Sequence, residues 1–484
     1  MQRVRQICLS VTAIGLVAGG CAREPAPADP QFVAQWMRTS LAIVRSERLG
    51  PPVATRISAY GALALYEGYA ADARSSLRTL GGQLNGLATL PSAPPDAALD
   101  GATMAAAAEG VVLDSLLRDA TPGTRRTIDS LAAAQIRTRR TAGVDSMASA
   151  QSVTHGRALG NAILAWAATD SFYATRGRAW KPSGRRDAWE NTADVSQFIP
   201  QTMSGQSDLV LLANPNLRED VEQATTKGTF TNRPKADGPT TLPSFNPVKP
   251  TEPYWGQLRP FVLTDGDVCA PPPPPVYSEA PGSAFRAMAQ AFHDSVKVLT
   301  PEQKQVALFW ADNPVATGTP GFHWISVVNQ MVARRALNAD AAVELYALTS
   351  LAIADAFIGC WREKYRSNVV RPVTYVRRTI DPAFQTLIPT PPFPEYPSGH
   401  SVQSGAAVHV LIALLGDTIP YADSTQVDIG QPARRFESFS AARREVAISR
   451  VYAGVHYMPA VLDGLTQSEC VGARVRALVT RRSR

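Results

Sequence analysis

The sequence predicts an all-α protein in which two helical bundles are joined by a proline-rich irregular segment. Three observations support this fold class. Apolar residues recur at helical spacing over most of the chain, runs that alternate polar with β-branched residues are nearly absent, and prolines gather between residues 232 and 282. Helical periodicity without strand-like alternation is typical of domains in which helices pack on helices.

Length and composition indicate a packed globular protein. The chain has 484 residues, of which 45% are hydrophobic and 18% charged, enough for one large domain or two ordinary ones. Loss of residues 1–20 would remove Arg3 and Arg5 and no acidic residue, so the formal charge would fall from +7 to +5. Because lysine and arginine are scattered rather than gathered in a stripe, small anions are favoured as ligands and nucleic acid is not expected as a partner.

The N-terminus has the pattern of a secretion signal. A basic start precedes an apolar stretch at 7–17, and small residues stand directly before Cys21. This is similar to a bacterial lipobox, which predicts an exported protein, periplasmic or tethered to the outer membrane by a lipid on Cys21. An ordinary signal peptide in which Cys21 has no special role also fits. No later stretch has the eighteen or so apolar residues of a membrane-spanning helix, so we expect a soluble body held to the membrane by its lipid anchor only.

The remaining chain divides into a tether at 21–30, an N-terminal helical domain at 31–231, a proline-rich connector at 232–282 and a C-terminal helical domain at 283–484. Helices are predicted in the first domain at 32–48, 52–77, 103–118, 123–140 and 146–169, several with Pro, Asp, Ser or Thr in capping positions. The connector contains five consecutive prolines at 271–275, which exclude regular helices and central strands. In the second domain helices are predicted at 284–298, 301–310, 323–337, 341–365, 401–415 and 438–451.

Two motifs in the second domain place basic and anion-binding groups close together in sequence. Lys364 and Arg371 stand seven residues apart at the end of a predicted helix, a spacing that places both on one helix face, and Pro372 is expected to end the helix and turn the chain. A solvated basic face also fits this segment taken alone. Further on, a proline-rich loop delivers Ser398, Gly399 and His400 to the start of the next helix. A hydroxyl, an unshielded amide and a helix N-terminus form an anion site, and a histidine there suits proton transfer.

A third motif consists of Ser449 and Arg450, five intervening residues, and His456, and Pro459 is expected to end this segment. Arg450 offers a planar fork of donors for two oxygens, which lysine cannot copy. His456 offers a ring nitrogen that can bind a metal or attack phosphorus, although a single histidine near a helix end is usually structural.

Together the motifs Lys-x6-Arg-Pro, Pro-Ser-Gly-His and Ser-Arg-x5-His resemble those of the superfamily that joins vanadium-dependent haloperoxidases with type 2 phosphatidic acid phosphatases and bacterial acid phosphatases. All three have the full spacing. The segments 254–256, 307–312, 354–357 and 390–394 are similar to the bacterial vanadium haloperoxidase branch in particular. The resemblance implies a helical fold whose C-terminal bundle carries a site for vanadate or phosphate.

The resemblance also implies a role for each motif residue. His456 would be the vanadium ligand, His400 the acid/base on the opposite side, and Lys364 the group that polarises bound peroxide. Trp361 and Phe393 match positions that line a halide pocket, although plain core packing explains such aromatics equally well. The groups expected to bind the equatorial oxygens are Lys364, Arg371, Ser398, the amide of Gly399, and Arg450.

One position departs from the superfamily pattern. An aspartate commonly stands four residues after the last histidine and holds its ring, whereas this chain has Ala460 there. Asp463, one turn further on, is the alternative support. The other histidines, His155, His293, His323 and His409, lie outside the motifs.

Three functions fit these residues. The first is a haloperoxidase that uses vanadate and hydrogen peroxide to oxidise a halide to hypohalous acid, which then attacks a small organic acceptor. The second is a periplasmic acid phosphatase that cleaves a phosphate ester without vanadate, through a phosphohistidine at His456. The third is a lipoprotein that binds oxyanions without catalysis. A homodimer is left open, as is the pairing of Cys269, Cys360 and Cys470, which allow one disulfide and one free thiol.

Overall fold

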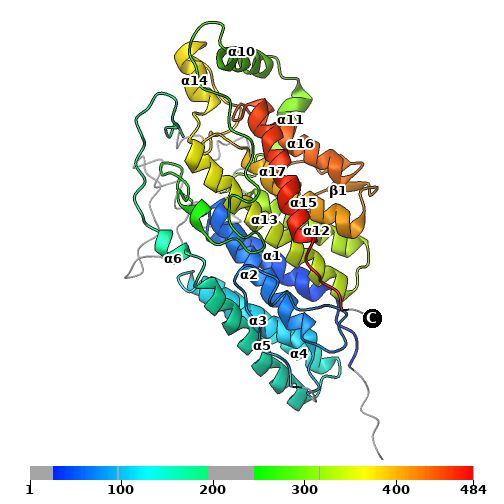
Figure 1. Cartoon of the computed structure of the whole chain (residues 1–484). Coiled ribbons are helices and arrows are strands. Elements are labelled where there is room, and N and C mark those ends of the chain that lie inside the picture. Colours follow the sequence, from blue (N-terminus) through cyan, green and yellow to red (C-terminus); the bar gives the residue numbers. More distant parts are fainter. Residues whose placement is uncertain (1–24, 95–96, 194–244, 315–316, 483–484) are drawn as a thin grey trace, which may run out of the picture.

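The computed structural model describes residues 25–94, 97–193, 245–314 and 317–482, and these form an elongated stack of helices (Figure 1). The all-α prediction is confirmed. The predicted signal at 1–20, Cys21 and the connector residues 232–244 lie outside the described residues. The N-terminal elements are α1 (Gln31–Ser46), α2 (Pro51–Ala70), α3 (Gly101–Leu116), α4 (Pro122–Thr141), α5 (Ser146–Ala167) and the short α6 (Phe172–Thr175).

Small side chains let the N-terminal helices pack closely. Helix α3 lies between α2 and α5 and also contacts α4, while α2 packs on its other side against the C-terminal helix α13 (Ala339–Ser367). A Cβ added at Gly156 of α5 would lie 2.3 Å from the carbonyl oxygen of Met104 in α3. Small residues therefore let the backbones of α3 and α5 approach each other directly.

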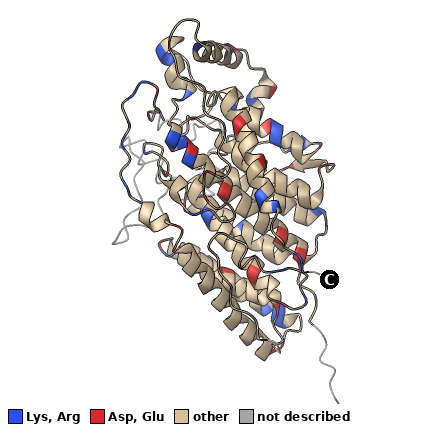
Figure 2. Cartoon of the chain, in the orientation of Figure 1, with Lys and Arg blue, Asp and Glu red and all other residues tan. Residues whose placement is uncertain are grey.

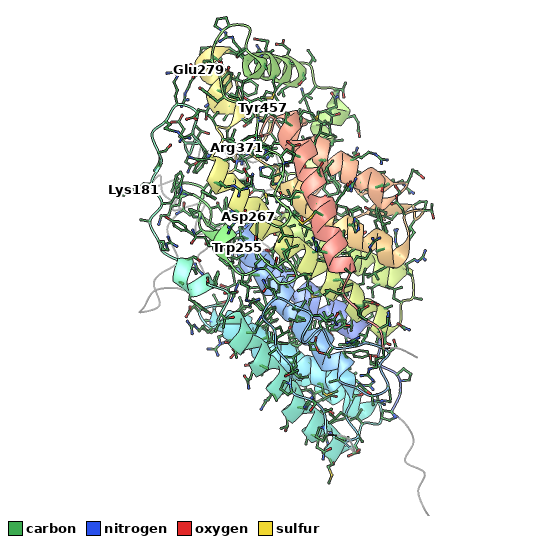
Figure 3. All side chains as sticks on the ribbon, viewed as in Figure 1. Lys181, Trp255, Asp267, Glu279, Arg371 and Tyr457 are labelled. Atoms are coloured by element: carbon green, nitrogen blue, oxygen red, sulfur yellow. A yellow bond between two sulfur atoms is a disulfide. The ribbon has the colours of Figure 1, made fainter. Side chains whose placement is uncertain are left out.

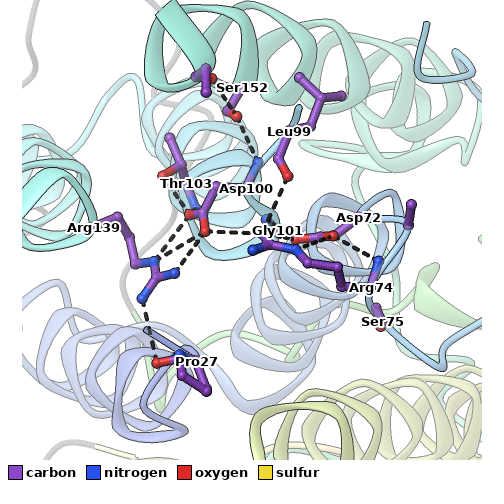
Figure 4. Close-up of polar contacts among 12 residues, drawn as sticks. Pro27, Asp72, Arg74, Ser75, Leu99, Asp100, Gly101, Thr103, Arg139 and Ser152 are labelled. Carbon is purple, nitrogen blue, oxygen red and sulfur yellow. Dashed lines mark hydrogen bonds and ion pairs between the residues drawn. The ribbon is translucent and has the colours of Figure 1, made fainter. Parts of the chain in front are cut away.

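A buried polar network fixes the start of α3 (Figure 4). Asp100 caps the helix by accepting a hydrogen bond from the amide of Thr103 at 2.9 Å, and it also pairs with Arg139 of α4 at 2.8 Å. The same guanidinium donates to the carbonyl oxygen of Ala26 at 2.8 Å. The described end of the predicted tether, residues 25–30, is thus held against the first bundle.

The described part of the connector, from residue 245, wraps onto α13 instead of forming long elements. Its one 3-10 turn, η1 (Trp255–Gln257), approaches α13 so closely that a Cβ on Gly256 would lie 2.3 Å from the Cα atom of Arg362. Asp355, buried in α13, accepts three connector amides, from residues 261 to 263, at 2.6 to 2.9 Å. A disulfide joins Cys269 to Cys470 and leaves Cys360 as a buried free thiol. The pairing that the sequence left open is thereby assigned.

The C-terminal bundle is built around α13 and α15, and one continuous hydrophobic core runs through both bundles. Helix α13 is long and apolar enough to cross a membrane by length and composition, unlike the expectation from sequence, but 94% of its most apolar window is buried inside the protein. Charged residues are spread over the helices in the view of Figure 2. The remaining elements are α10 (Ala284–Lys297), α11 (Pro301–Phe309), α12 (Thr319–Arg334), α14 (Pro372–Thr379), α15 (Gly399–Leu415), η2 (Val427–Ile429), α16 (Phe439–Tyr452) and α17 (Met458–Arg476).

Two helices and a small sheet are among the elements that sequence reasoning missed. Helices α14 and α17 begin at or beside Pro372 and Pro459, which were interpreted as ends of helices. Proline in a first helical turn loses no hydrogen bond, so it is compatible with a helix start. A small antiparallel sheet pairs β1 (Tyr421–Asp423) with β2 (Arg434–Phe436). Strands of three residues are too short to produce a visible alternation.

Glu109 in α3 is a fully buried carboxyl group, and neither of its oxygens has a hydrogen-bond partner in the described part of the chain. Burial raises its pKa from 4.5 to about 8. The folded protein therefore retains a proton that the unfolded chain releases, and this group's contribution to the free energy of unfolding falls as the pH rises from about 5 to about 8. We expect Glu109→Gln to remove this fall, worth up to about 1.4 kcal/mol per pH unit, in denaturant titrations across that range.

The difference in unfolding free energy between wild type and variant isolates Glu109 from other titrating groups. Glu437→Gln, which makes the same chemical change at an exposed glutamate directly after β2 in sequence, is the matched control. An identical pH dependence in wild type and Glu109→Gln would show that Glu109 is ionised or solvated in the folded state.

Candidate active site

Five elements bring the three motifs together at one end of the C-terminal bundle. Lys364 lies near the end of α13, Arg371 caps α14, and Arg450 lies in the last turn of α16. Ser398 caps α15, and His456 lies in the loop between α16 and α17. Figure 3 labels Arg371 and Tyr457, the neighbour of His456, at this end of the molecule.

A turn between α13 and α14 decides how Lys364 and Arg371 are presented. Helix α13 ends at Ser367, the left-handed backbone of the C-cap residue Asn368 (φ 50°) reverses the chain, and α14 starts at Pro372. The two cations therefore approach the site from different elements and do not stack on one helix face, as an unbroken helix would require. The turn predicted from Pro372 is confirmed.

The geometry around His456 fixes its tautomer. Its Nε2 atom lies 3.2 Å from Nη1 of Arg371, and its Nδ1 atom lies 3.0 Å from Oε1 of Glu395. Because a guanidinium can only donate, Nε2 must be the acceptor and Nδ1 must carry the proton that goes to Glu395. Burial and the neighbouring cations also lower the pKa of His456 well below its ordinary value. The neutral ring thus keeps a lone pair on Nε2, the atom that a metal or a phosphoryl group requires.

Glu395, and not Asp463, supports His456, which corrects the assignment made from sequence. Asp463 accepts a hydrogen bond from the hydroxyl of Tyr396 at 2.9 Å. Glu395 accepts both the ring of His456 and the amide of Tyr457, each at 3.0 Å. Burial raises the pKa of Glu395 to about 7, against the effects of nearby Arg371 and Lys364. Glu395 lies inside the recognised loop, three residues before Ser398, and its acidic side chain among prolines was the signal that could have identified it.

Two buried arginines each keep a free donor. Arg371 donates through Nε to the carbonyl oxygen of Phe393 at 2.9 Å and through Nη1 to that of Val455 at 2.8 Å, but its Nη2 has no partner among the described residues. Arg450 donates through Nη1 to the carbonyl oxygen of Trp310 at 2.9 Å, and its Nε likewise has no described partner. Burial lowers the pKa of Arg371 to about 9 and that of Arg450 to about 10. Each group is therefore a desolvated cation with one donor nitrogen that lacks an acceptor among the described residues.

Lys364 holds the loop that carries the second motif. Its Nζ atom donates to the carbonyl oxygens of Pro394 and Glu395 at 3.0 Å and to that of Pro397 at 2.5 Å. All three ammonium donors are therefore engaged, which the sequence did not indicate. Burial lowers the pKa of Lys364 to about 7, with a further contribution from Arg371. In this structure Lys364 contributes charge and loop position, and contact with an oxyanion requires it to exchange one carbonyl.

His400 lies near the carboxylate of Asp312, which is held in place by a hydrogen bond from His323. Its Nε2 is buried, has no described hydrogen-bond partner, and lies 3.9 Å from Oδ2 of Asp312. The other oxygen of Asp312 accepts a hydrogen bond from His323, whose second nitrogen pairs with Asp423, both at 2.8 Å. Burial lowers the pKa of His323, but the two carboxylates outweigh it and raise the pKa to about 10. His323, placed outside the motifs by sequence, is thus a cation that orients Asp312 toward His400.

A cavity of about 240 Å³ opens onto these groups. Gly399, His400, Arg450 and His456 line it, whereas Lys364, Arg371 and Ser398 are fully buried and do not. Trp361 and Phe393, the expected halide-pocket residues, also line it, with ring centroids 4.9 Å apart. The structure therefore brings every predicted motif residue to one place, some at the cavity surface and some directly beneath it.

These groups fit a tetrahedral oxyanion. Three atoms without a described partner converge here: Nη2 of Arg371, Nε of Arg450 and Nε2 of His400. They lie beside the N-terminus of α15, where the backbone N–H groups of the first helical turn have no partner within the helix and can bind an anion. Ser398 adds a hydroxyl whose oxygen already accepts the amide of Ser401, so its proton is available to an anion. Buried cations and donors without acceptors are costly, and an anion would satisfy them and restore their lowered pKa values.

Known proteins resemble this chain in sequence and fold. Residues 344–484 match the family model described as the VCPO second helical-bundle domain. Vanadium chloroperoxidase from Curvularia inaequalis is 28% identical over 281 residues, which are 42% of this chain. The match spans 45% of that relative's length, less than half.

Solved structures extend the likeness to nearly the whole chain. A bacterial vanadium-dependent iodoperoxidase superposes with a TM-score of 0.76 at 29% identity and covers 95% of this chain and 99% of its own. A holo-type bacterial vanadium-dependent chloroperoxidase has a TM-score of 0.66, covering 94% and 98%, and at 16% identity it supports the fold alone. The family model, the curated relative and the iodoperoxidase structure therefore all support the vanadium haloperoxidase family for this chain.

Proposed function

We propose that this protein is a vanadate-dependent haloperoxidase that oxidises a halide with hydrogen peroxide to hypohalous acid. The observation that carries the proposal is the convergence of two unpartnered buried donors, from Arg371 and Arg450, with the unpartnered ring nitrogen of His400 and the ring nitrogen Nε2 of His456. The likeness to a bacterial vanadium-dependent iodoperoxidase over 99% of that chain supports peroxidase chemistry over phosphatase chemistry.

The residues that would hold vanadate divide into ligand, clamp and acid/base. His456 offers Nε2 as the ligand atom, while Arg371, Arg450, Lys364, Ser398 and the amide of Gly399 would clamp the oxygens. When bound, vanadate makes hydrogen peroxide a stronger oxidant toward halide. His400 is neutral in the buried site, so its Nε2 can accept a proton from hydrogen peroxide, and Asp312 at 3.9 Å would stabilise the resulting cation.

A phosphatase would use the same pocket, because vanadate resembles the phosphoryl transition state. The discriminating experiment follows bromination of a phenolic dye by hydrogen peroxide, and separately the hydrolysis of a phosphate ester, with and without orthovanadate. We expect bromination that requires vanadate and is lost in His456→Ala. Phosphate-ester turnover without any vanadate-dependent bromination or iodination would refute the proposal.

A further inference from the structure

The cavity is larger than a halide requires and is mostly apolar. At about 240 Å³ it exceeds the roughly 150 Å³ of an engineered apolar cavity that binds benzene. Its lining includes six prolines, which carry no N–H donor, together with leucine, isoleucine and phenylalanine side chains. The prolines are Pro51, Pro314, Pro320, Pro389, Pro391 and Pro392. The apolar lining of the cavity would therefore recognise a bound molecule by its shape and its apolar surface.

Charge is confined to the catalytic end. Among the described lining residues the ionisable side chains are Asp312, His400, Arg450 and His456, all of which belong to the site already described. A charged organic substrate would lose its hydration in the cavity without gaining an ion pair or hydrogen bond from the apolar lining, which costs free energy. The wall therefore favours a neutral organic molecule.

The wall also lacks the side chains that an oxidised halogen consumes most readily. Among the described lining residues there is no methionine, cysteine, tyrosine or lysine. Thioethers and thiols are the usual targets of oxidants in proteins, and phenols and amines react with hypohalous acid as well. Trp361 is the exception, and its indole N–H is held by the carbonyl oxygen of Thr251 at 3.0 Å. An electrophilic halogen could therefore persist in this cavity long enough to meet a bound acceptor.

We propose that the cavity binds the organic acceptor itself, a neutral aromatic molecule of one or two rings such as a phenol or naphthol, and that halogenation takes place there. This inference rests on the proposed function. Hydrogen peroxide takes two electrons from the halide and, with one proton, yields hypohalous acid and water. The ring then forms its carbon–halogen bond as the O–X bond breaks, and the released ring proton joins the hydroxide to form water. His400, at the catalytic end, is placed to exchange these protons.

The first test measures binding of 1-naphthol to the vanadate-free protein by calorimetry, so it does not depend on activity. Leu308 lines the cavity at its open end and is 37% exposed, and Leu414 on α15 is also 37% exposed but lies outside the cavity. We expect Leu308→Trp to weaken 1-naphthol binding at least tenfold and Leu414→Trp to leave it unchanged. Ala311→Phe, from another part of the lining, is a second blocking variant if the new tryptophan points outward.

The second test compares product ratios with bromide, hydrogen peroxide and vanadate present. We expect the ratio of 4-bromo- to 2-bromo-1-naphthol to differ from that given by reagent hypobromous acid, and to return toward it in Leu308→Trp. Bromination at the reagent ratio without binding of 1-naphthol would overturn the cavity inference and leave the proposed function intact. Binding that Leu308→Trp abolishes, without any vanadate-dependent bromination or iodination, would refute the proposed function and support only the aromatic site.

Discussion

Replacement of Arg371 or Arg450 by alanine is expected to weaken vanadate binding by about 2 kcal/mol or more, roughly 30-fold in the dissociation constant. Each guanidinium is fully buried and keeps one donor without a described partner, so its contact with an anion is charge-assisted and shielded from water. Equilibrium dialysis against orthovanadate measures the affinity directly. Arg371→Lys should recover only part of the loss, because an ammonium cannot reproduce the planar fork that also contacts Val455 and His456.

The control is Arg377→Ala on α14. Arg377 also donates to a backbone carbonyl, that of Phe384 at 2.7 Å, but it is exposed and outside the cavity. It should lose a comparable backbone contact without a change in vanadate affinity, and melting temperatures separate binding from folding defects. If both Arg371→Ala and Arg450→Ala stay folded and bind vanadate as wild type does, neither arginine belongs to the clamp.

The sequence predicted the helical class because its evidence is local. Helices such as α5, expected at 146–169 and observed at Ser146–Ala167, combine a capping Asp145 with apolar periodicity. Helices α14 and α17 were missed because Pro372 and Pro459 were interpreted as helix ends, although a first-turn proline is equally compatible with a start. The local sequence pattern shows that a helix is present. Whether a proline ends that helix or begins the next one depends on which neighbouring segment packs into the core.

The sequence predicted which residues form the candidate site but not the hydrogen bonds that connect them. The motif spacing identified Arg371, Arg450 and His456, which the fold then brought within contact of one cavity or directly beneath it. The engagement of Lys364 with three loop carbonyls could not be predicted, because it depends on the path of a loop some thirty residues away. The same holds for His323, whose partner Asp423 is one hundred residues distant in sequence.

The support of His456 is the clearest case in which sequence spacing misled. Asp463 was offered as the alternative because it lies one helical turn beyond Ala460, where the superfamily commonly has its aspartate. The chain is not helical at His456, since α17 begins only at Met458, so helical spacing does not relate the two side chains. Asp463 instead meets Tyr396, and the carboxylate at His456 comes from Glu395, which precedes it by 61 residues.

Glu395→Gln is therefore expected to weaken vanadate binding about 10- to 100-fold, the usual effect of removing a carboxylate behind a metal-binding histidine. The amide oxygen of glutamine can still accept hydrogen bonds from Nδ1 of His456 and from the amide of Tyr457, so the fold should persist. The variant loses only the negative charge that makes Nε2 a stronger ligand for a metal. Glu395→Ala should have the larger effect, because the ring also loses its orientation. Dialysis against orthovanadate and thermal denaturation measure the two consequences separately.

Asp463→Asn provides the matched control, since it makes the same chemical change at the position that the sequence favoured. Asp463 contacts the hydroxyl of Tyr396, so Asp463→Asn should leave vanadate affinity within about twofold of wild type. This change is smaller than the loss of about tenfold or more that is expected when a residue that orients a metal-binding histidine is replaced. If Asp463→Asn weakens binding and Glu395→Gln does not, then His456 turns toward Asp463 when the anion binds, and the hydrogen bond to Glu395 belongs only to the vanadate-free protein. Because both variants replace a carboxylate by its neutral amide, their difference measures the contact with His456 and not the chemical change alone.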